Sequence, residues 1–486
     1  MNIEIPKNIL FTIAVLQKHT FEAFLVGGCV RDYLLKKTPK DWDITTNAKP
    51  EEIIDVFNKE NIKTLYENEF GTVAVFVDKE IVEVTTYRIE SDYTDKRHPD
   101  SIKWTRNIEE DLKRRDFTIN AMAFDVPRGT FIDLFHGKED LEARIIRTVG
   151  SPDERFNEDA LRMLRAIRFN AQLGKEWKIE ENTLKSICKN KELLGKVSNE
   201  RIRDEFIKIV MSENAKEGII LLKETGLMHY VIKELELGYG CTQNKHHIYD
   251  VFEHNLESFN FTIKKNFCMH IRIAALLHDI AKPITKEGSG ECATFYNHEI
   301  IGAQIVKKIL NRLKFPKKDI DKIVNLVRYH LFYYNVDEVT ESSIRRLVKN
   351  VGLENMNDLI KLRMADRIGS GCPKAEPYKL RHLKYLIEKV SKDPISVKML
   401  KINGNDIINL LNINPSRTIG LVLDILLAEV LNDPKKNNGE YLKEKVLELG
   451  KKKEQELELI ADDSRKEIEN VVKKEDKMTK EKYWLV

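Results

Sequence analysis

The 486-residue chain lacks several features that would assign it to a class of protein at once. Its six cysteines form no Cys-x-x-Cys pair, which argues against a zinc ribbon or a thioredoxin-type redox site. The most apolar late run, Ile419 to Leu431, contains Asp424 and Glu429 and is too short and too charged to span a bilayer. The first residues carry no basic segment followed by an apolar one, so we expect no signal peptide. Together these absences predict a cytoplasmic protein with reduced thiols and no membrane partner.

An excess of charge of one sign is also missing. Lysine and arginine total 81 and aspartate and glutamate total 78, a net charge of +3, which excludes a uniformly basic nucleic-acid coat but allows a local basic face. The sequence contains no tandem repeat and no low-complexity tract. With 42% hydrophobic and 33% charged residues, the composition is that of a folded chain, and the length predicts two to four domains.

The predicted fold class is α+β, with a small N-terminal head built on a mixed β-sheet and a long all-helical region after it. The head is predicted to mix helices with short strands, among them a helix at 30–35 and strands at 24–26, 42–45, 73–77 and 81–85. From about residue 153 helical periodicity dominates, so we place the first boundary near Gly150. The run 451–482 has as many acidic as basic residues, which predicts a solvated helix or a frayed tail.

Two glycines and two aspartates stand close together near the N-terminus. A Gly-Gly turn separates a strand from a helix in Leu25-Val26-Gly27-Gly28-Cys29-Val30-Arg31-Asp32. Backbone N–H groups of such a turn can approach a phosphate, and Arg31 can add a bidentate donor. Asp41 and Asp43 are two residues apart, so on a strand both carboxylates would face one side. Such a pair repels itself unless a divalent cation lies between, and oxygen ligands suit Mg²⁺.

Glu83 is a candidate third carboxylate, because it lies between two valines on a predicted strand of the same head. A solvent-facing position on a half-buried strand explains this glutamate equally well. The pair of aspartates is therefore the firmer prediction.

The segment from Glu158 to Phe169 has the periodicity of an amphipathic helix. Wound as one helix, it collects its charged residues on one side, namely Glu158, Asp159, Arg162, Arg165 and Arg168. Asp159 and Arg162 are three residues apart and are expected to pair. An ordinary salt-bridged surface would show the same pattern. The functional alternative is recognition of a base, because arginine donates hydrogen bonds and a carboxylate accepts them from an exocyclic amino group.

A second set of polar residues interrupts an apolar helical region. His278-Asp279 ends an apolar run and Lys282 follows three residues later, and polar groups buried in this way need a partner or a metal ion. More distant residues complete the set: His254, Asp366 and, between them, His298 and His330, which could hold a second metal. A structural hydrogen bond explains any one of these histidines, but mixed histidine and aspartate sets are recognised sites for divalent metals, including transition metals.

Taken together, the head motifs resemble those of the class II tRNA nucleotidyltransferases, the CCA-adding enzymes of the polymerase-β superfamily, and those of their relatives, the bacterial poly(A) polymerases. The resemblance is carried by Leu25 to Leu35 with Asp41-Trp42-Asp43, by Arg114-Arg115-Asp116-Phe117-Thr118-Ile119-Asn120-Ala121-Met122-Ala123, and by Glu158-Asp159-Ala160-Leu161-Arg162. The histidine-aspartate set resembles the HD phosphohydrolase superfamily, and many bacterial members of the first family carry such a domain. One departure is Lys36-Lys37, where the family often has Gly-Arg, but it changes a turn residue and not a ligand.

The resemblance implies four segments: a nucleotidyltransferase head over 1–150, a helical neck and body over 151–245, an HD-type metal-binding domain over 246–370 and a helical tail over 371–486. It implies that Asp41 and Asp43 are catalytic and hold Mg²⁺. It implies nucleotide binding by Gly28, Arg31, Arg115, Asp159, Arg162, Arg165 and Arg168. Among these, Asp159 and Arg162 would select the base, with Glu158 in support. The implied ligands of the HD metal are His254, His278, Asp279 and Asp366.

The implied activity is template-independent addition of CCA to the 3′ end of tRNA from CTP and ATP, with release of pyrophosphate. The polar, turn-rich stretch 88–100 would be the mobile loop that the family needs to change from C to A addition, which argues against a CC-only enzyme. An A-adding enzyme or a poly(A) polymerase shares the head and neck and is the nearest alternative. A phosphohydrolase whose HD site is the main activity is another, and an RNA-binding module without activity is disfavoured by the intact carboxylates and arginines. The oligomeric state stays open.

Overall fold

The computed structural model describes residues 4–68, 71–90, 102–244, 248–336, 338–391 and 397–485. The chain divides into two compact units: the first contains residues 1–330 and 361–373, and the second contains residues 331–360 and 374–486. This division is coarser than the four predicted segments, which stay a prediction. Residues 91–101, which include most of the predicted mobile loop 88–100, lie outside the described residues. On either side of it, β6 (Arg88–Glu90) pairs antiparallel with β7 (Ile102–Trp104).

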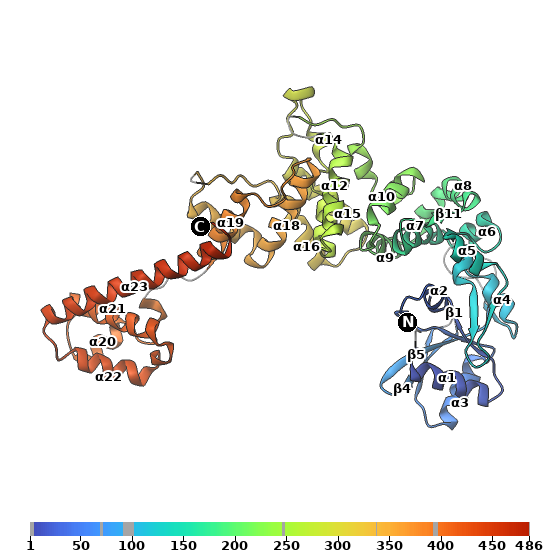
Figure 1. Ribbon diagram of the computed structural model, residues 1–486, viewed down its shortest axis with the longest axis horizontal. Helices are drawn as coiled ribbons and strands as arrows, with labels where there is room; N and C mark the ends of the chain where they lie inside the picture. The colour runs from blue at the N-terminus through green and yellow to red at the C-terminus, as the bar shows by residue number, and fades with distance from the viewer. Residues whose placement is uncertain are drawn as a thin grey trace. The chain divides into compact units, whose positions relative to one another are not determined.

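The first unit begins with a head built on a seven-stranded mixed sheet, in the order β3-β4-β5-β2-β1-β8-β9 (Figure 1). The strands are β1 (Ala23–Val26), β2 (Ile44–Thr46), β3 (Thr64–Asn68), β4 (Thr72–Val77), β5 (Glu80–Thr86), β8 (Met122–Asp125) and β9 (Thr130–Asp133). The predicted hairpin is confirmed, since β4 and β5 pair antiparallel on either side of Asp78 and Lys79. Central β2 pairs antiparallel with β1 and parallel with β5, and all four residues of β1 are buried.

Short helices cover and connect this sheet. The helices α1 (Lys7–Lys18) and α3 (Pro50–Lys59) pack on each other and on the sheet, whereas α2 (Gly28–Leu34), the predicted helix after the glycines, packs on β1 and β8 (Figure 1). The head also contains α4 (Ile108–Lys113), the 3₁₀ turn η1 (Thr118–Asn120) and α5 (Gly137–Ala143). Tyr33 of α2 stacks on Phe124 of β8, with ring centroids 5.5 Å apart, and this contact fixes α2 against the sheet.

Beyond the head, the described chain is helical apart from β11 (Lys178–Ile179), which pairs with β10 (Ile145–Ile146). The α+β prediction is therefore confirmed. The helices of the first unit are α6 (Pro152–Glu158), α7 (Leu161–Leu173), α8 (Glu181–Asn190), α9 (Asn199–Val210), α10 (Ala215–Glu224), α11 (Met228–Ile232), α12 (Val251–Lys264), α13 (Met269–Leu277), α14 (Lys282–Thr285), α15 (His298–Arg312) and α16 (Lys317–Tyr329). We refer to α6 and α7 as the neck.

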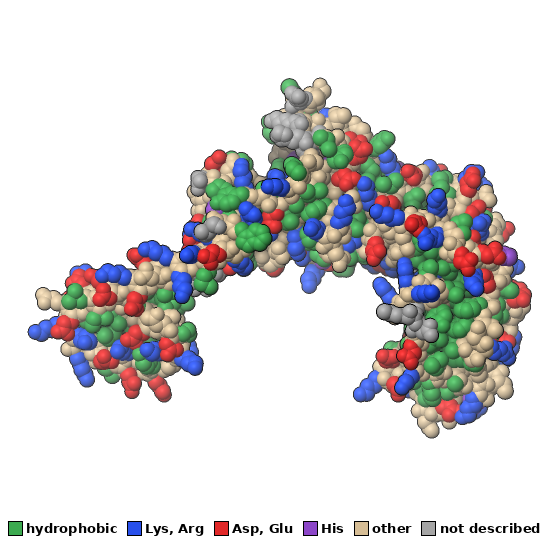
Figure 2. All heavy atoms as spheres, viewed as in Figure 1, with side chains coloured by type: hydrophobic (Ala, Val, Ile, Leu, Met, Phe, Trp, Pro, Cys, Tyr) green, Lys and Arg blue, Asp and Glu red, His purple; other side chains and the backbone are tan. Residues whose placement is uncertain are grey.

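The second unit contains α17 (Glu341–Val351), α19 (Tyr378–Ser391), α20 (Gly404–Leu411), α21 (Arg417–Asn432), α22 (Gly439–Leu449) and α23 (Glu454–Lys482), and α18 (Leu353–Gly369) begins in it. Its charge run 451–482 forms α23, which buries Leu457 and Ala461 in a core with α21, so the helical alternative is right and the frayed tail is wrong. Basic and acidic side chains are interspersed on the visible face of this unit (Figure 2). Within the described residues, no helix is both long and apolar enough to cross a bilayer.

Candidate active site

Three acidic side chains lie on the central strands, two just before the start of β2 and the third in the middle of β5. Asp41 and Asp43 occupy the segment that enters β2, so the strand predicted at 42–45 starts two residues later than expected. Ile44 pairs with Val84 in the parallel ladder, which places Asp43 beside Glu83. Asp41, Asp43 and Glu83 are all exposed.

The three carboxylates influence one another electrostatically. Desolvation, and then the charges of Glu67, Asp43 and Asp41, raise the pKa of the Glu83 carboxyl. Desolvation also raises the pKa of Asp43, against the opposing effect of Arg115 and with a further contribution from Asp41. This mutual repulsion is what a divalent cation would relieve, and the donors present are the oxygen ligands that Mg²⁺ prefers.

The Gly-Gly turn brings the carboxylates next to a cation. Gly27 has φ +78°, and a Cβ atom there would lie 3.1 Å from Nη1 of Arg115 and 3.8 Å from Oδ2 of Asp43. Gly28, the predicted nucleotide-binding glycine, begins α2, and its corresponding Cβ would lie 3.6 Å from Nη2 of Arg31. Gly27 is therefore the residue of the pair whose missing side chain keeps the space between Arg115 and Asp43 open, a role that the sequence analysis did not assign.

Arg115 is held in place by a residue that the sequence analysis missed. Asp111 of α4 is fully buried and accepts hydrogen bonds from Arg115 Nη2 at 3.1 Å and from Arg114 Nη2 at 2.7 Å. Burial alone would raise the pKa of the Asp111 carboxyl, but the two guanidinium groups lower it. The signal in the sequence was the i, i+3 and i, i+4 spacing, which puts the three side chains on one face of a helix.

A partly buried chain of hydrogen bonds connects the head to the neck. Arg31 Nη1 donates to Oδ1 of Asn120 at 2.8 Å, and Nδ2 of Asn120 donates to Oδ1 of Asp116 at 3.2 Å. Oδ2 of Asp116 accepts from Nε of Arg165 on α7 at 2.7 Å. Burial opposes ionisation of Asp116, but Arg165 and Arg162 lower its pKa to about 2. The structure thus brings the predicted residues Arg31 and Arg165 together through two residues of the second family motif.

Replacement of Asp116 by asparagine is expected to lower the free energy of unfolding at neutral pH by about 2 kcal/mol. The pKa of about 2 lies below the ordinary value of 3.8, so this stabilisation is present above pH 3.8 and is lost as the pH falls through 2. The difference between variant and unchanged protein should shrink over that range. Tryptophan fluorescence in urea measures it, because Trp42, Trp104 and Trp177 lie in this part of the chain. Asp55→Asn, on the exposed surface of α3, is the control, and a difference that stays constant down to pH 2 would contradict the assignment.

The predicted helix 158–169 is interrupted, and its charged side is not on the surface. Glu158 ends α6, Asp159 is extended with φ −135° and ψ 103°, and α7 begins at Leu161. The Asp159 side chain accepts from the backbone N–H of Leu161 at 3.1 Å, so it starts α7 in the manner of a helix cap. Arg162 and Arg168 are buried, with 8% and 9% of their surface exposed, so an ordinary salt-bridged surface is excluded.

The expected pairing of the Asp159 and Arg162 side chains is wrong, because each has another partner. Arg162 donates to Oε2 of Glu158 at 2.5 Å and to the carbonyl of Arg114 at 2.9 Å. Asp159 accepts two hydrogen bonds from Arg201 of α9, at 3.2 Å and 2.7 Å. The break between α6 and α7 turns the two side chains away from the register that one continuous helix would give.

Helix α9 supplies the second partner that the sequence analysis missed. Glu205, four residues after Arg201 and 3% exposed, places Oε2 at 2.9 Å from Nε of Arg168. Burial, and then the charge of Arg165, lower the pKa of Arg168 to about 10, while Glu205 opposes this shift. One face of α9 therefore positions two of the predicted nucleotide-binding residues of the neck, Asp159 and Arg168.

The second candidate centre is the histidine-aspartate cluster of the first unit. Its residues come from α12, from the end of α13 and from α18: His254, His278, Asp279 and Asp366, all buried. Nε2 of His254 lies 2.9 Å from Nε2 of His278, 3.2 Å from Oδ2 of Asp279 and 3.4 Å from Oδ1 of Asp366. The ligand atoms of His254, His278 and Asp366 all lie within 4.8 Å of one another. The structure thus assembles the predicted set.

The cluster extends to two further histidines on the other side of the same carboxylate. Nε2 of His298 and Nε2 of His330 lie 3.3 Å and 3.4 Å from Oδ1 of Asp279. Oδ2 of Asp279, which faces His254 and His278, also lies 2.6 Å from Nζ of Lys282. Asp279 therefore lies between two groups of histidines.

The hydrogen bonds of Nδ1 in three of the histidines show which ring nitrogen faces the cluster around Asp279. Nδ1 of His278, His298 and His330 lies 2.9, 2.6 and 2.7 Å from the carbonyl oxygen of the third residue before it. A carbonyl oxygen only accepts, so each Nδ1 carries the proton and each Nε2 turns a lone pair inward. Burial lowers the pKa of His254, but the hydrogen bonds and charges of Asp279 and Asp366 outweigh it and raise this pKa to about 9. Inward lone pairs held by outer hydrogen bonds are the arrangement of a metal site.

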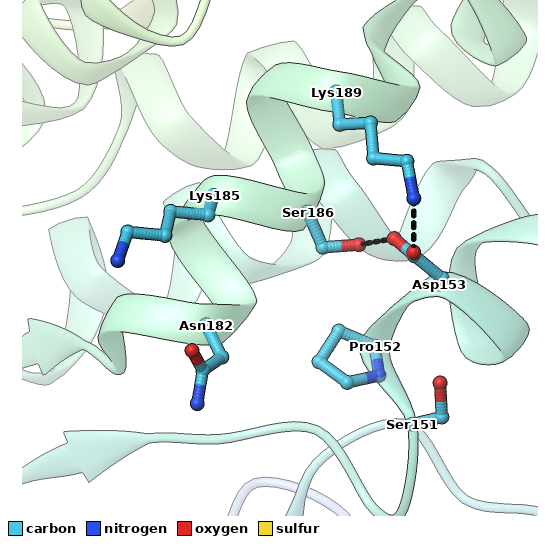
Figure 3. A pocket seen from close by; sticks show the side chains of 7 residues that line it. All are labelled: Ser151, Pro152, Asp153, Asn182, Lys185, Ser186 and Lys189. Atoms are coloured by element: carbon cyan, nitrogen blue, oxygen red, sulfur yellow. Dashed lines mark hydrogen bonds and ion pairs between the residues drawn. The ribbon is translucent and has the colours of Figure 1, made fainter.

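A shallow pocket of about 240 Å³ lies elsewhere on the neck, between the start of α6 and α8 (Figure 3). It is lined by Ser151, Pro152, Asp153, Asn182, Lys185, Ser186 and Lys189. Ser186 and Lys189 turn onto Asp153, as Figure 3 shows, and none of the predicted nucleotide-binding residues line the pocket. Its polar lining and exposed lysines distinguish it from the site around Asp43.

Three family models match successive parts of the chain. They are the poly(A) polymerase head domain over residues 23–147, the probable RNA and SrmB-binding site of polymerase A over 177–237, and the HD domain over 252–368. The CCA-adding enzymes of Lactobacillus helveticus and Enterococcus faecalis are 48% identical over 215 residues and 50% identical over 220 residues. These matches cover 44% and 45% of this chain and 52% and 53% of those proteins, so the chain spans about half the length of the curated relatives it matches.

Solved structures match over most of the chain. The crystal structure of the Bacillus stearothermophilus CCA-adding enzyme in complex with CTP is 28% identical, with a TM-score of 0.58, and the match covers 91% of this chain and 96% of that one. A likeness of fold extends to the Thermotoga maritima CCA-adding enzyme complexed with tRNA, which is 21% identical with a TM-score of 0.50 over 90% of this chain and 94% of that one. The chain therefore matches the poly(A) polymerase head domain and the HD domain in succession, and it is similar to CCA-adding enzymes in sequence over about half of its length and in fold over most of it.

Proposed function

We propose that the protein adds CCA to the 3′ end of tRNA, by template-independent nucleotidyl transfer from CTP and ATP with release of pyrophosphate. The observation that carries the proposal is the meeting of carboxylates and cations at the Gly-Gly turn, where Asp43 and Arg115 both line the space that a side chain on Gly27 would fill. The similarity to a CCA-adding enzyme solved with CTP supports the choice of substrate.

In this proposal Asp41 and Asp43 hold Mg²⁺, and Glu83 is the third carboxylate of the same site. The three side chains offer only oxygen donors, which fits this ion. When bound, the ion supplies charge neutralisation on the triphosphate and a more acidic 3′-hydroxyl on the tRNA. Arg115 beside Gly27 and Arg31 beside Gly28 orient the triphosphate, so that the 3′-hydroxyl attacks the α-phosphorus in line with the departing pyrophosphate.

Base selection is assigned to Asp159 and Arg162, with Glu158 in support. Within the protein, Arg162 donates hydrogen bonds from three of its five N–H groups, two of them on Nη1. Asp159 accepts three hydrogen bonds, of the about four that a carboxylate can accept. Arg162 therefore keeps two N–H donors, and Asp159 keeps about one acceptor position, for a ligand. Cytosine and adenine both present an amino group next to a ring nitrogen that accepts, so one acceptor and one donor from the protein suit both bases.

The neck and body, residues 151–245, are proposed to dock tRNA by its backbone and shape. Lys185 and Lys189 of α8, each with 70% of the side chain exposed, line the pocket of Figure 3 within the segment that matches the RNA-binding model. Exposed lysines on a helix are suited to phosphate contacts. With tRNA as substrate, the proposed location of the reaction is the cytoplasm.

Transcripts that end in CC, incubated with ATP alone, separate the proposed activity from its nearest alternative. A CCA-adding enzyme adds a single A and stops, whereas a poly(A) polymerase makes long tails that a sequencing gel resolves. A second set of transcripts, which end immediately before the CC, should gain two C residues when incubated with CTP alone. Failure to use CTP would make the protein an A-adding enzyme.

Phosphoester hydrolysis at the HD site is a second candidate activity, favoured by the inward-facing nitrogens of His254, His278, His298 and His330 around Asp279. These residues, with Asp366, would hold a divalent transition metal, for which imidazole and carboxylate ligands are suited. Such a metal activates water against a phosphoester.

Replacement of His278 by alanine is expected to weaken transition-metal binding by at least about tenfold, because it removes a ligand whose Nδ1 is anchored on Ala275. Metal content after dialysis against Ni²⁺ or Mn²⁺ measures the effect, together with hydrolysis of a phosphodiester substrate. Asp41→Ala is the control, since it should keep both metal binding and hydrolysis while losing nucleotide addition. Equal metal content in the two variants would contradict the assignment.

A further inference from the structure

Phe169 of α7 lies at the point where three arginine side chains meet. The guanidinium carbons of Arg168, Arg31 and Arg165 lie 4.3, 5.2 and 5.5 Å from the centre of its ring. Arg31 comes from the head and the other two from the neck. The ring itself is 5% exposed and packs edge to face on Phe117, with centroids 5.6 Å apart, so it is a fixed part of the junction.

Each of these arginines forms an ion pair with a carboxylate. Arg31 pairs with Asp32 at 2.8 Å, Arg165 with Asp116 at 2.5 Å, and Arg168 with Glu205 at 2.9 Å. A carboxylate occupies one edge of a guanidinium group, which leaves other N–H donors of each arginine for a ligand. The three cations remain close enough to repel one another, and the charge of Arg165 contributes to the lowered pKa of Arg168.

The face of an aromatic ring attracts cations and is also a flat barrier that a guanidinium group can lie against. The ring of Phe169 therefore does two things that an aliphatic side chain of similar size would not. It offsets part of the repulsion among the three arginines, and it keeps each one apart from its neighbours. A spaced set of three guanidinium groups, one of them beside Gly28, matches an anion with several charged groups in a row, which is the form of a nucleoside triphosphate.

We infer that Phe169 is a positioning residue that spaces Arg31, Arg165 and Arg168 for the triphosphate of the incoming nucleotide. This inference rests on the proposed function, because it takes the nucleotide to bind at these arginines. Phe169 itself does not contact the reacting atoms in this account; it acts through the arginines. Its loss should weaken recognition of the phosphate chain and leave recognition of the base unchanged.

The test is the ratio of affinities for ATP and AMP, measured by competition against a fluorescent nucleotide, in the full-length protein. Phe169→Leu should lower the preference for ATP over AMP by about tenfold and raise KM for ATP and CTP alike, with kcat changed by less than about threefold. Phe169→Trp, which keeps an aromatic face, should stay within about threefold of the unchanged protein in all three quantities. The ratio of CTP to UTP incorporation should be the same in all variants.

Phe156→Leu is the matched control, since Phe156 of α6 is fully buried and no guanidinium group lies over its ring in the described part of the chain. Phe169→Met serves if the leucine variant does not fold. An unchanged preference for ATP in a folded leucine or methionine variant would overturn the inference, as would an equal loss in Phe156→Leu. If the unchanged protein itself binds ATP no more tightly than AMP, the inference and the proposed function fall together. If the unchanged protein prefers ATP to AMP and the Phe169 variants show the same ratio of affinities, only the inference about Phe169 is contradicted.

Discussion

Replacement of Asp43 by asparagine is expected to lower the rate of nucleotide addition by on the order of 10³-fold, the loss that follows removal of one preorganised charge from an active site. Asparagine keeps the shape of the side chain and removes the negative charge. Asp43 lies next to Glu83 across the parallel ladder, and it lines the space beside Gly27 together with Arg115, so its charge lies between a second carboxylate and a guanidinium group. Transfer of a radiolabelled nucleotide to tRNA, under single-turnover conditions, measures the chemical step.

The same substitution should leave the fold intact. The pKa of Asp43 is raised in the folded protein, so the fold favours an uncharged side chain at this position, which asparagine provides. Removing its charge removes a repulsion from Asp41, so the melting temperature should be unchanged or slightly higher. Asp55→Asn on α3, another exposed aspartate of the head, is the control for charge alone and should add nucleotides at the normal rate. An Asp43→Asn variant within tenfold of the unchanged rate would contradict the assignment of Asp43 as a catalytic residue.

Replacement of Asp159 by asparagine is expected to reduce the preference for CTP over UTP by about 10- to 100-fold, which corresponds to the loss of one bidentate base contact. The carboxylate can only accept, so it suits the amino group of cytosine and of adenine. The amide that replaces it can also donate, and so can reach the carbonyl group that uracil presents at the same position. Incorporation of each of the four nucleotides into tRNA that lacks CCA measures the change.

Asparagine is as good a helix cap as aspartate, so the start of α7 at Leu161 should be preserved. The two hydrogen bonds from Arg201 to Asp159 are weakened by loss of the charge, which affects the position of the side chain but not the hydrogen-bonding pattern of the base. Asp153→Asn, also in the neck but in the separate pocket of Figure 3, is the control and should keep the normal preference. Unchanged discrimination against UTP in the Asp159 variant would move base selection to other residues.

The parts of the fold that could be predicted from sequence are those in which local pattern decides. The alternating and apolar runs at β1, β4 and β5 are strands because their side chains fill a sheet core, and the glycines after β1 do start a helix. The histidine-aspartate set could be predicted because polar residues in an apolar helix must meet partners. The sequence predicts that Asp43 lies within a central strand, whereas it lies just before the first residue of β2.

What could not be predicted depends on contacts between distant segments. The break at Asp159 depends on Arg201 of α9, which lies 42 residues further on and draws the carboxylate away from Arg162. The burial of Arg162 depends on its contacts with Glu158 and Arg114, and that of Arg168 on its contact with Glu205. The charged side of the helix is therefore packed between segments, although its sequence alone would also fit a solvent-exposed face. Periodicity describes one helix by itself and contains no information on which neighbour packs against its charged side.

The most direct test of the central claim is the 3′ sequence of a tRNA transcript without CCA, after incubation with the unchanged protein, Mg²⁺ and all four nucleotides together. The account predicts that C, C and A are added in that order and that addition then stops, although the protein contains no template. Tails of mixed sequence, or a run of A residues, would contradict base selection by the neck. No extension at all would contradict the proposed activity of the head and leave hydrolysis at the HD site as the function to test.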